Sequence, residues 1–438
     1  MGARVSDPET GTRVPSSPLK IPAFRNYWIA RIALALGQYA TLLIIGWQTY
    51  SIARDGGMGV AAASGQLGLI GLLQFVPLFV LMPFSGLAAD RFDRKSVARA
   101  TMTLQFACAG ALAWLTYADA MTIPWLFTIA VLLGVVRAFN GPSLSALAPN
   151  LVPKELLPSA IALATIARQV GMIVGPAIGG YLQAVQPGLP YAVSAGLFLV
   201  AILTLSLIGE VPQSAIPGAR RPIGQIVDGL QYVWRNKMVL GTITLDLVAV
   251  FLAGATALFP VYARDILQVG ETGLAQLAMA PAIGAVITAA IFSFRPITSN
   301  VGPKMLWAVV VYGIATIVFG LSTSMPLSLA MLFVVGAADM FSVYIRQSLV
   351  QLHTPDDKRG RVSSVSLLTI SASNEFGDFF SGSLAFVIGP VAAVVGGGVG
   401  AIAATGLWSH IFPVLRTTRT FDPPPELVER NERQESPA

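Results

Sequence analysis

The sequence predicts an all-α integral membrane protein with twelve transmembrane helices in two six-helix halves. Composition is the first observation behind this prediction. Of the 438 residues, 54% are hydrophobic and only 11% are charged, whereas a soluble domain carries about 25% charged residues. The second observation is that the apolar residues occur in blocks of about 20–25, a length that crosses roughly 30 Å of hydrocarbon as helix. The blocks do not alternate polar and apolar residues, as the strands of a transmembrane barrel do.

Twelve apolar blocks follow one another, and a longer polar connection separates the sixth from the seventh. We expect spans near residues 28–52, 66–88, 97–117, 124–147, 158–183, 189–209, 239–262, 272–293, 305–324, 326–349, 364–388 and 390–413. The expected domains are a cytoplasmic N-terminal tail (1–25), an N-terminal six-helix bundle (26–209), a cytoplasmic linker with an amphipathic helix (210–238), a C-terminal six-helix bundle (239–415) and a disordered cytoplasmic tail (416–438). No part outside the spans is large enough for a catalytic domain, and no H-E-x-x-H or G-x-S-x-G motif occurs, so we expect no enzyme.

The basic residues place both termini in the cytoplasm, because cytoplasmic loops carry the excess of Lys and Arg. Arg54 and Arg264 are the only basic residues in loops that are predicted to face outside. The net charge of +6 therefore follows from topology and from attraction to anionic lipid, and needs no nucleic-acid partner. The first apolar block is already of full span length, so we expect no signal peptide. The single Cys108, in span three, is expected to be a packing residue.

The loop between spans two and three reads GLAADRFDRK. It resembles the loop of the major facilitator superfamily at this same position, G-x-L-a-D-r-x-G-r-k. The matching residues are Gly86, Asp90, Arg91, Arg94 and Lys95, while Ala88 and Asp93 depart from the pattern. The alternative is a basic loop that merely flanks the membrane.

The resemblance implies a major facilitator fold in which this loop latches one conformation. Asp90 would then cap the start of span eleven, where the helix dipole favours an anion, with Ser363 and Ser364 as further caps. The equivalent loop of the second half, SNVGPKM, has Ser299 in place of the acid. The predicted latch is therefore one-sided.

Span five contains GMIVGPAIGG, whose small or turn-forming residues are Gly171, Gly175, Pro176, Gly179 and Gly180. Three of the glycines repeat every four residues and share one helix face. Helices in lipid associate by close backbone approach, which small residues permit. Span eight repeats the string PAIG, so we expect spans five and eight to pack tightly near the outer surface. Within the superfamily the string resembles g-x-x-x-G-P-x-x-G-G, which is typical of proton-driven exporters; the alternative is a general packing face.

Charged residues inside the spans are the candidates for proton coupling or substrate binding, because each costs at least ~2.5–3.5 kcal/mol on insertion scales. Span eleven reads SNEFGDFFSG, in which Glu375 and Asp378 share a face beside Asn374. Two acids that lie close together in a low dielectric cannot easily both be ionised. One of them is therefore expected to accept a proton near neutral pH.

Spans seven and ten add the acids Asp246 and Asp339, and Arg346 lies two turns beyond Asp339. The simplest neutralisation pairs Arg346 with Asp339 or with Asp246. Either pairing leaves the acids of span eleven for coupling or for substrate.

Span four contains LGVVRAFNG, which resembles the exporter pattern l-x-x-x-R-x-x-q-G. Leu133, Arg137 and Gly141 match, and Asn140 stands in place of Gln. The resemblance implies that Arg137 assists proton transfer by holding a nearby acid ionised. A structural ion pair is the alternative for this arginine.

Four further strings resemble the enterobactin-exporter-like (transmembrane secretion effector) branch of the superfamily. They are PAFRNYWIAR, ADRFDRK, LAPNLVPKELLPSAIAL and TPDDKRGRVSS. This resemblance implies a monomeric, proton-coupled exporter of a siderophore or other small secondary metabolite in the bacterial inner membrane. Its expected partners are the substrate, protons and the lipid bilayer, with no cofactor. His353 and His410 are solitary, so no metal site is expected.

Two other functions are alternatives to this one. A proton-driven multidrug efflux antiporter is the main alternative, with Trp47, Phe139, Phe379 and Phe380 as candidates for an aromatic cavity lining. A transporter-derived sensor without flux is disfavoured, because such a protein would have no need of the costly acids inside its spans.

Overall fold

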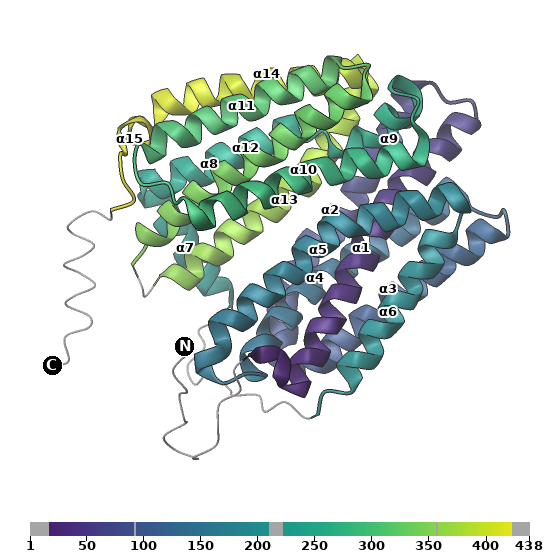
Figure 1. The fold of residues 1–438 in the computed structure, drawn as a ribbon, viewed down its shortest axis with the longest axis horizontal. Helices are drawn as coiled ribbons and strands as arrows, with labels where there is room; N and C mark the ends of the chain where they lie inside the picture. Colours follow the sequence, from purple (N-terminus) through teal and green to yellow (C-terminus); the bar gives the residue numbers. More distant parts are fainter. Residues whose placement is uncertain (1–16, 92, 210–221, 356–357, 423–438) are drawn as a thin grey trace. The chain divides into compact units, whose positions relative to one another are not determined.

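The computed structural model describes residues 17–91, 93–209, 222–355 and 358–422, and all the regular structure in these ranges is helical (Figure 1). The predicted all-α class is confirmed. The helices of the first half are α1 (Pro22–Asp55), α2 (Val60–Arg91), α3 (Arg94–Tyr117), α4 (Ile123–Leu147), α5 (Leu157–Val185) and α6 (Leu189–Ser206). Short turns of 3-10 helix are η1 (Pro18–Lys20), η2 (Ala148–Asn150) and η3 (Lys154–Leu156).

The second half begins with the helix expected in the linker. Its elements are α7 (Pro222–Arg235), α8 (Lys237–Ala253), η4 (Thr256–Leu258), α9 (Phe259–Val261), the π-helical turn η5 (Tyr262–Ile266), α10 (Gly270–Phe294), α11 (Val301–Leu321), α12 (Met325–Leu352), α13 (Arg359–Ile388), α14 (Pro390–Ile411) and α15 (Pro413–Thr417). Each of the twelve predicted apolar blocks therefore coincides with a helix or with a run of short helical segments.

Ten of these spans, within the described ranges, are long and apolar enough to cross a membrane. The other two predicted spans, α3 and α13, are 24 and 30 residues long but more polar. α3 opens with Arg94, Lys95 and Arg99, and in α13 only the last part, Phe376–Ile388, is apolar on average, although it contains Asp378. The candidate acids of span eleven are part of the reason that α13 is polar.

Contacts divide the chain into two compact units. One unit is Met1–Ile45 with Val76–Gly218, and the other is Gly46–Phe75 with Ala219–Ala438. The end of α1 and the start of α2 therefore group with the helices of the C-terminal half. This division differs from the two halves read along the sequence.

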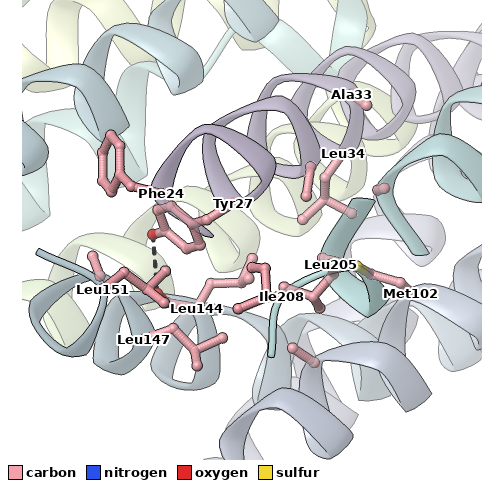
Figure 2. Packing of buried hydrophobic residues seen from close by; sticks show 14 of the residues in the cluster. Phe24, Tyr27, Ala33, Leu34, Met102, Leu144, Leu147, Leu151, Leu205 and Ile208 are labelled. Carbon is pink, nitrogen blue, oxygen red and sulfur yellow. Dashed lines mark hydrogen bonds between the residues drawn. The ribbon is translucent and has the colours of Figure 1, made fainter. Parts of the chain in front are cut away.

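The core of the first unit contains side chains from α1, α3, α4 and α6 (Figure 2). Phe24 and Tyr27 of α1 are fully buried, and their rings lie 5.7 Å apart between centroids. The hydroxyl group of Tyr27 donates to the carbonyl oxygen of Leu144 at 3.0 Å. A buried tyrosine needs such a partner for its hydroxyl group, so this bond fixes α1 against α4.

The core of the second unit joins α8, α11, α12 and α14. Tyr262 is fully buried, stacks on Phe319 at 4.5 Å and donates to the carbonyl oxygen of Gly320 at 2.8 Å. Large apolar side chains, among them Trp114, Phe294 and Trp307, are exposed on the described surface. Such exposure is expected where the solvent is lipid, and Trp is enriched at the membrane interfaces.

The linker helix α7 packs on α13. Gly229 approaches Arg361 so closely that a Cβ atom would lie 2.8 Å from its carbonyl oxygen, and Asp228 pairs with the same arginine at 3.3 Å. Val233 of α7 is buried, whereas Trp234 is 72% exposed. The helix therefore has one protein-facing side and one exposed side.

The C-terminal segment remains ordered beyond residue 416, where the sequence predicts the disordered tail to begin. The backbone N–H groups of Val301 and Gly302 donate to the carbonyl oxygens of Arg419 and Thr418 at 3.3 and 3.1 Å. The segment thus satisfies two donors at the start of α11, which would otherwise have no helical partner. Residues 423–438 lie outside the described ranges.

Candidate functional site

The seventh predicted span is broken near its middle. α8 ends at Ala253, Gly254 has an extended backbone, and the chain continues through η4, α9 and η5. Thr256 lies in this break, where its hydroxyl group donates a 3.0 Å hydrogen bond to Oδ1 of Asp378 on α13. Interrupted spans are frequent at the binding sites of transporters, because they free polar groups within the membrane. The break therefore positions a donor for one of the candidate acids.

Phenylalanine side chains near Asp378 in the sequence of α13 form a cluster with rings from α2 and α8. Phe251 stacks on Phe376 at 5.6 Å and lies 4.6 Å from Phe380, measured between ring centroids. Phe376 also lies 5.6 Å from Phe75 and 5.7 Å from Phe379. We call these five residues, Phe75, Phe251, Phe376, Phe379 and Phe380, the phenylalanine cluster. An acid beside aromatic faces is suited to binding an apolar or cationic small molecule.

Asp246 on α8 and Arg346 on α12 form an ion pair. Their side chains are only 9% and 3% exposed. This is one of the two pairings of Arg346 that the sequence leaves open. Nε of Arg346 has no hydrogen-bond partner among the described residues, so the neutralisation of this arginine rests largely on Asp246.

The remaining candidates of the second unit are less tightly held. Asp339 is half-buried on α12, and no ion pair to it occurs within the described part of the chain. Asn374 is exposed on α13. Glu375 follows it on the same helix, but its side chain lies outside what the structure describes. In the described ranges, no three His, Cys, Asp or Glu side chains gather as metal ligands would.

In the first unit, Arg137 and Asn140 lie one turn apart on α4. Arg137 is half-buried, and Asn140 is 7% exposed. Oδ1 of Asn140 is buried and has no described hydrogen-bond partner. A buried amide oxygen without a partner is costly, so Asn140 is the more unusual member of this pair.

Comparison with known proteins decides the family. The family model described as Major Facilitator Superfamily matches residues 27–377. The chain belongs to this superfamily. It is therefore a multi-pass membrane transporter and not an enzyme, and the family resemblance of the loop between spans two and three is confirmed.

Two relatives of this superfamily member match it over nearly all of both chains. The "Multidrug efflux pump Tap" of Mycobacterium tuberculosis (strain ATCC 25618 / H37Rv) is 26% identical over 410 residues, which cover 90% of this chain and 94% of the relative. The "Enterobactin exporter EntS" of Escherichia coli O1:K1 / APEC is 25% identical over 417 residues, with 92% and 94% covered.

Solved structures agree in fold. A bacterial homologue of the human lysosomal transporter Spinster superposes with a TM-score of 0.69 at 17% identity, over 91% of this chain and 99% of its own. A D-xylose–proton symporter gives a TM-score of 0.70 at 12% identity, over 90% and 99%. At these identities the similarity shows the major facilitator fold and nothing finer.

The superfamily loop is only partly described. The surroundings of Gly86 and the side chains of Asp90 and Arg91 are not among the features that the structure describes. Nζ of Lys95 donates to the carbonyl oxygens of Ser206, at 3.4 Å, and of Ile208, at the end of α6. Asp93 accepts from the backbone N–H of Ser96 at 2.9 Å and so caps α3. Asp93, one of the two residues that depart from the superfamily pattern, is thus the N-cap of the next helix.

The prediction that Ser363 and Ser364 cap the start of span eleven is wrong. α13 begins at Arg359, one turn earlier, because the polar residues before the apolar block also take helical conformation. Both serines therefore lie inside the helix.

The glycine face of span five packs on span one, a partner that the sequence does not predict, while the predicted packing of span five on span eight stays a prediction. A Cβ atom on Gly171 would lie 2.5 Å from Cβ of Ala35, and one on Gly175 would lie 2.7 Å from Cβ of Tyr39. Gly179 approaches the carbonyl oxygen of Ala40 in the same way, at 3.0 Å. All three contacts are with α1. Pro176 and Gly180 are buried in α5 as well.

The string PAIG in α10 has its own partner, which is α12. Gly336 of α12 packs directly on the backbone of Pro281, and Gly284 packs on Phe333. The shared string marks two helices that each need a close neighbour.

Sequence reasoning missed Thr256 and the phenylalanine residues at positions 75, 251 and 376. A signal for the first was present, since Gly254 and Pro260 interrupt an apolar span around a threonine. No comparable signal exists for Phe75 and Phe251, because a phenylalanine inside a span most often faces lipid or packs in a core.

Proposed function

We propose that this chain is a proton-coupled exporter of the bacterial inner membrane that works by alternating access. Its first candidate cargo is a siderophore or another small secondary metabolite. The observation that carries the proposal is the position of Asp378, which accepts from Thr256 at the break of the seventh span beside the phenylalanine cluster. A candidate proton acceptor, Asp378, is then adjacent to the phenylalanine cluster that would bind the cargo.

The ion pair between Asp246 and Arg346 supports this assignment of roles. Each of these two groups neutralises the other inside the unit. Arg346 is thereby engaged away from α13, and the acids of that helix are the better candidates to exchange a proton during the cycle. Glu375 remains the first candidate and Asp378 the second.

The direction of transport is inferred from the relatives. Both relatives compared above are named for efflux or export. The string GMIVGPAIGG, which resembles the exporter pattern, lies where α5 contacts α1 so closely that side chains larger than glycine do not fit. These observations support export over import.

We expect Glu375→Gln to abolish export driven by a proton gradient while substrate binding stays detectable. The amide keeps the size of the side chain but cannot release a proton. The measurement is uptake into inside-out vesicles with an imposed pH gradient. The probes are enterobactin, the cargo in the name of the E. coli relative, and ethidium, a lipophilic cation.

Glu155→Gln is the matched control, because Glu155 is exposed in η3 outside the spans. It makes the same chemical change and should leave export unchanged. If Glu375→Gln exports at the rate of the control, Glu375 has no role in coupling. If Asp378→Asn alone abolishes transport, the coupling role passes to Asp378.

The phenylalanine cluster favours a second candidate function, multidrug efflux. Aromatic faces with one acid bind apolar cations well, whereas a siderophore rich in anionic groups would be repelled by Asp378. A deletion strain decides between the two. We expect a siderophore-like compound to be retained in the cells and missing from the medium under low iron. Sensitivity to lipophilic cations without any such retention would instead establish the multidrug function.

A further inference from the structure

The tripeptide Ala-Arg-Asp occurs at the end of span one and again at the end of span seven. The first copy, Ala53–Asp55, ends α1, and the second copy, Ala263–Asp265, lies in η5. These are the first spans of the two halves, so the two copies occupy equivalent places in the two six-helix repeats. Both copies fall within the second compact unit.

The two copies pair with each other reciprocally. Arg54 of the first copy holds Asp265 of the second through two bonds, from Nη2 to Oδ1 at 3.1 Å and from Nε to Oδ2 at 3.2 Å. Arg264 of the second copy holds Asp55 of the first, from Nη2 to Oδ1 at 2.6 Å. The tripeptide is therefore complementary to itself.

The pair formed by Arg54 and Asp265 is the stronger of the two. Both side chains are largely covered, at 27% and 20% exposed, and the carboxylate also accepts from the hydroxyl group of Tyr50. A two-bond arginine–carboxylate contact adds geometric specificity to charge attraction. Asp55 is 69% exposed, and exposed pairs contribute little. We call Tyr50, Arg54, Asp55, Arg264 and Asp265 the outer clasp.

The backbone positions both copies. α1 ends in a tight turn in which Gly57 has φ +85° and the N–H of Met58 donates to the carbonyl oxygen of Ala53 at 3.0 Å. Nη1 of Arg54 also donates to the carbonyl oxygen of Met58 at 2.6 Å. The second copy lies in a π-helical turn, a rare geometry that is frequent at functional sites. These ends are specific structures, not frayed helices.

A close helix contact accompanies the outer clasp in the same unit. Gly68 of α2 packs against Gly382 of α13, and a Cβ atom on Gly68 would lie 3.0 Å from the carbonyl oxygen of Phe379. Phe379 is the residue after Asp378. The segment Gly46–Phe75 is thus held to the rest of the second unit both by charges and by direct packing on the helix that carries the candidate acids.

We propose that the outer clasp holds the outer side of the transporter closed and must open once in each transport cycle. Arg54 and Arg264 are the only basic residues in the loops predicted to face outside, and both are committed to this contact. Outward opening must separate the ends of span one and span seven, and therefore must break both pairs. The inference rests on the alternating access of the proposed function, but on neither the cargo nor proton coupling.

The test is the accessibility of a reporter cysteine from outside. Cys108 is replaced by Ala, and Ala255, which precedes Thr256 in the break of span seven, is replaced by Cys. Intact cells are treated with a membrane-impermeant maleimide, with no substrate added. We expect the cysteine to be labelled about tenfold faster when Asp265→Asn is added to this parent protein. This corresponds to a shift of about 1.4 kcal/mol in the equilibrium between the outward-closed and outward-open states.

Two further variants make the result decisive. Arg54→Glu with Asp265→Arg exchanges the two charges. We expect this double variant to be labelled more slowly than Arg54→Glu alone or Asp265→Arg alone. Asp119→Asn removes an acid from another outer turn and should label at the parent rate. The proposal is overturned if Asp265→Asn labels no faster than Asp119→Asn, or if the exchanged pair labels as fast as the single variants. Because the assay needs no transport, loss of export alone would count against the proposed function and not against the outer clasp.

Discussion

Replacing Arg346 by Met is expected to lower the free energy of unfolding by about 3–5 kcal/mol, the usual cost of leaving a buried partner charge alone. The charge left alone is Asp246, whose side chain is 9% exposed between α8 and α12. The helices around it contribute apolar side chains to the core of the second unit, among them Leu245, Ala249 and Ile345. The measurement is thermal unfolding of the purified protein in detergent, followed by intrinsic fluorescence.

The double variant Asp246→Leu with Arg346→Met separates the cost of an unpaired charge from the value of the pair. Two apolar residues of similar size often replace a buried ion pair without loss, so we expect most of the stability to return. Arg295→Met is the control, because Arg295 is exposed at the end of α10. If the Arg346→Met variant is as stable as this control, the ion pair makes no contribution to the stability of the fold.

The pattern of apolar blocks predicts the helices well because span length and apolar composition are local properties. The exceptions have a physical cause. α13 begins five residues before its predicted apolar block, since Arg359–Ser363, which carry two arginines, are also helical. Span seven breaks at Gly254, since glycine is a poor helix former and Pro260 has no backbone N–H to continue the helical hydrogen bonds.

The partners of individual residues are much less predictable. Arg346 had two possible acids at suitable positions, and only the folded structure selects Asp246. The glycine face of α5 was correctly identified as a close-packing surface, but its partner is α1. A face rich in small residues specifies that some backbone comes near, and it carries no information about which one.

The partners within the outer clasp are equally hard to predict from the sequence, although its residues are easy to notice. Arg54 and Arg264 stand out in the sequence as the only basic residues in the predicted outer loops. The repeated tripeptide Ala-Arg-Asp around them is visible in the sequence as well, yet the sequence does not predict that the two copies pair with each other. That information arises only when the ends of α1 and η5 come together in space.

Replacing Gly175 by Leu is expected to abolish transport and to reduce the amount of folded protein in the membrane. Even a Cβ atom at this position would lie 2.7 Å from Cβ of Tyr39 and 3.1 Å from the carbonyl oxygen of Leu36. The second of these contacts is with backbone, so α1 itself has to move. Overpacking of this kind costs about 1–3 kcal/mol, and more where the neighbour cannot yield. The measurements are size-exclusion profiles of a fluorescent fusion and export of the two probes named above.

Gly196→Leu is the matched control, because Gly196 is a helical glycine of the same unit that is exposed and has no atom within 4 Å of its Cβ position. It adds the same side chain on the face of α6 that meets lipid, where leucine is well tolerated. Full export by Gly175→Leu would contradict the close contact between α5 and α1. A Gly175→Leu protein that is folded but inactive would be the more informative result, because it would show that this contact must loosen or re-form during the transport cycle. In lipid, where apolar side chains gain little by leaving the solvent, the fit between helix surfaces supplies much of the association between helices. A single leucine in such a contact therefore acts on conformational change as strongly as on folding.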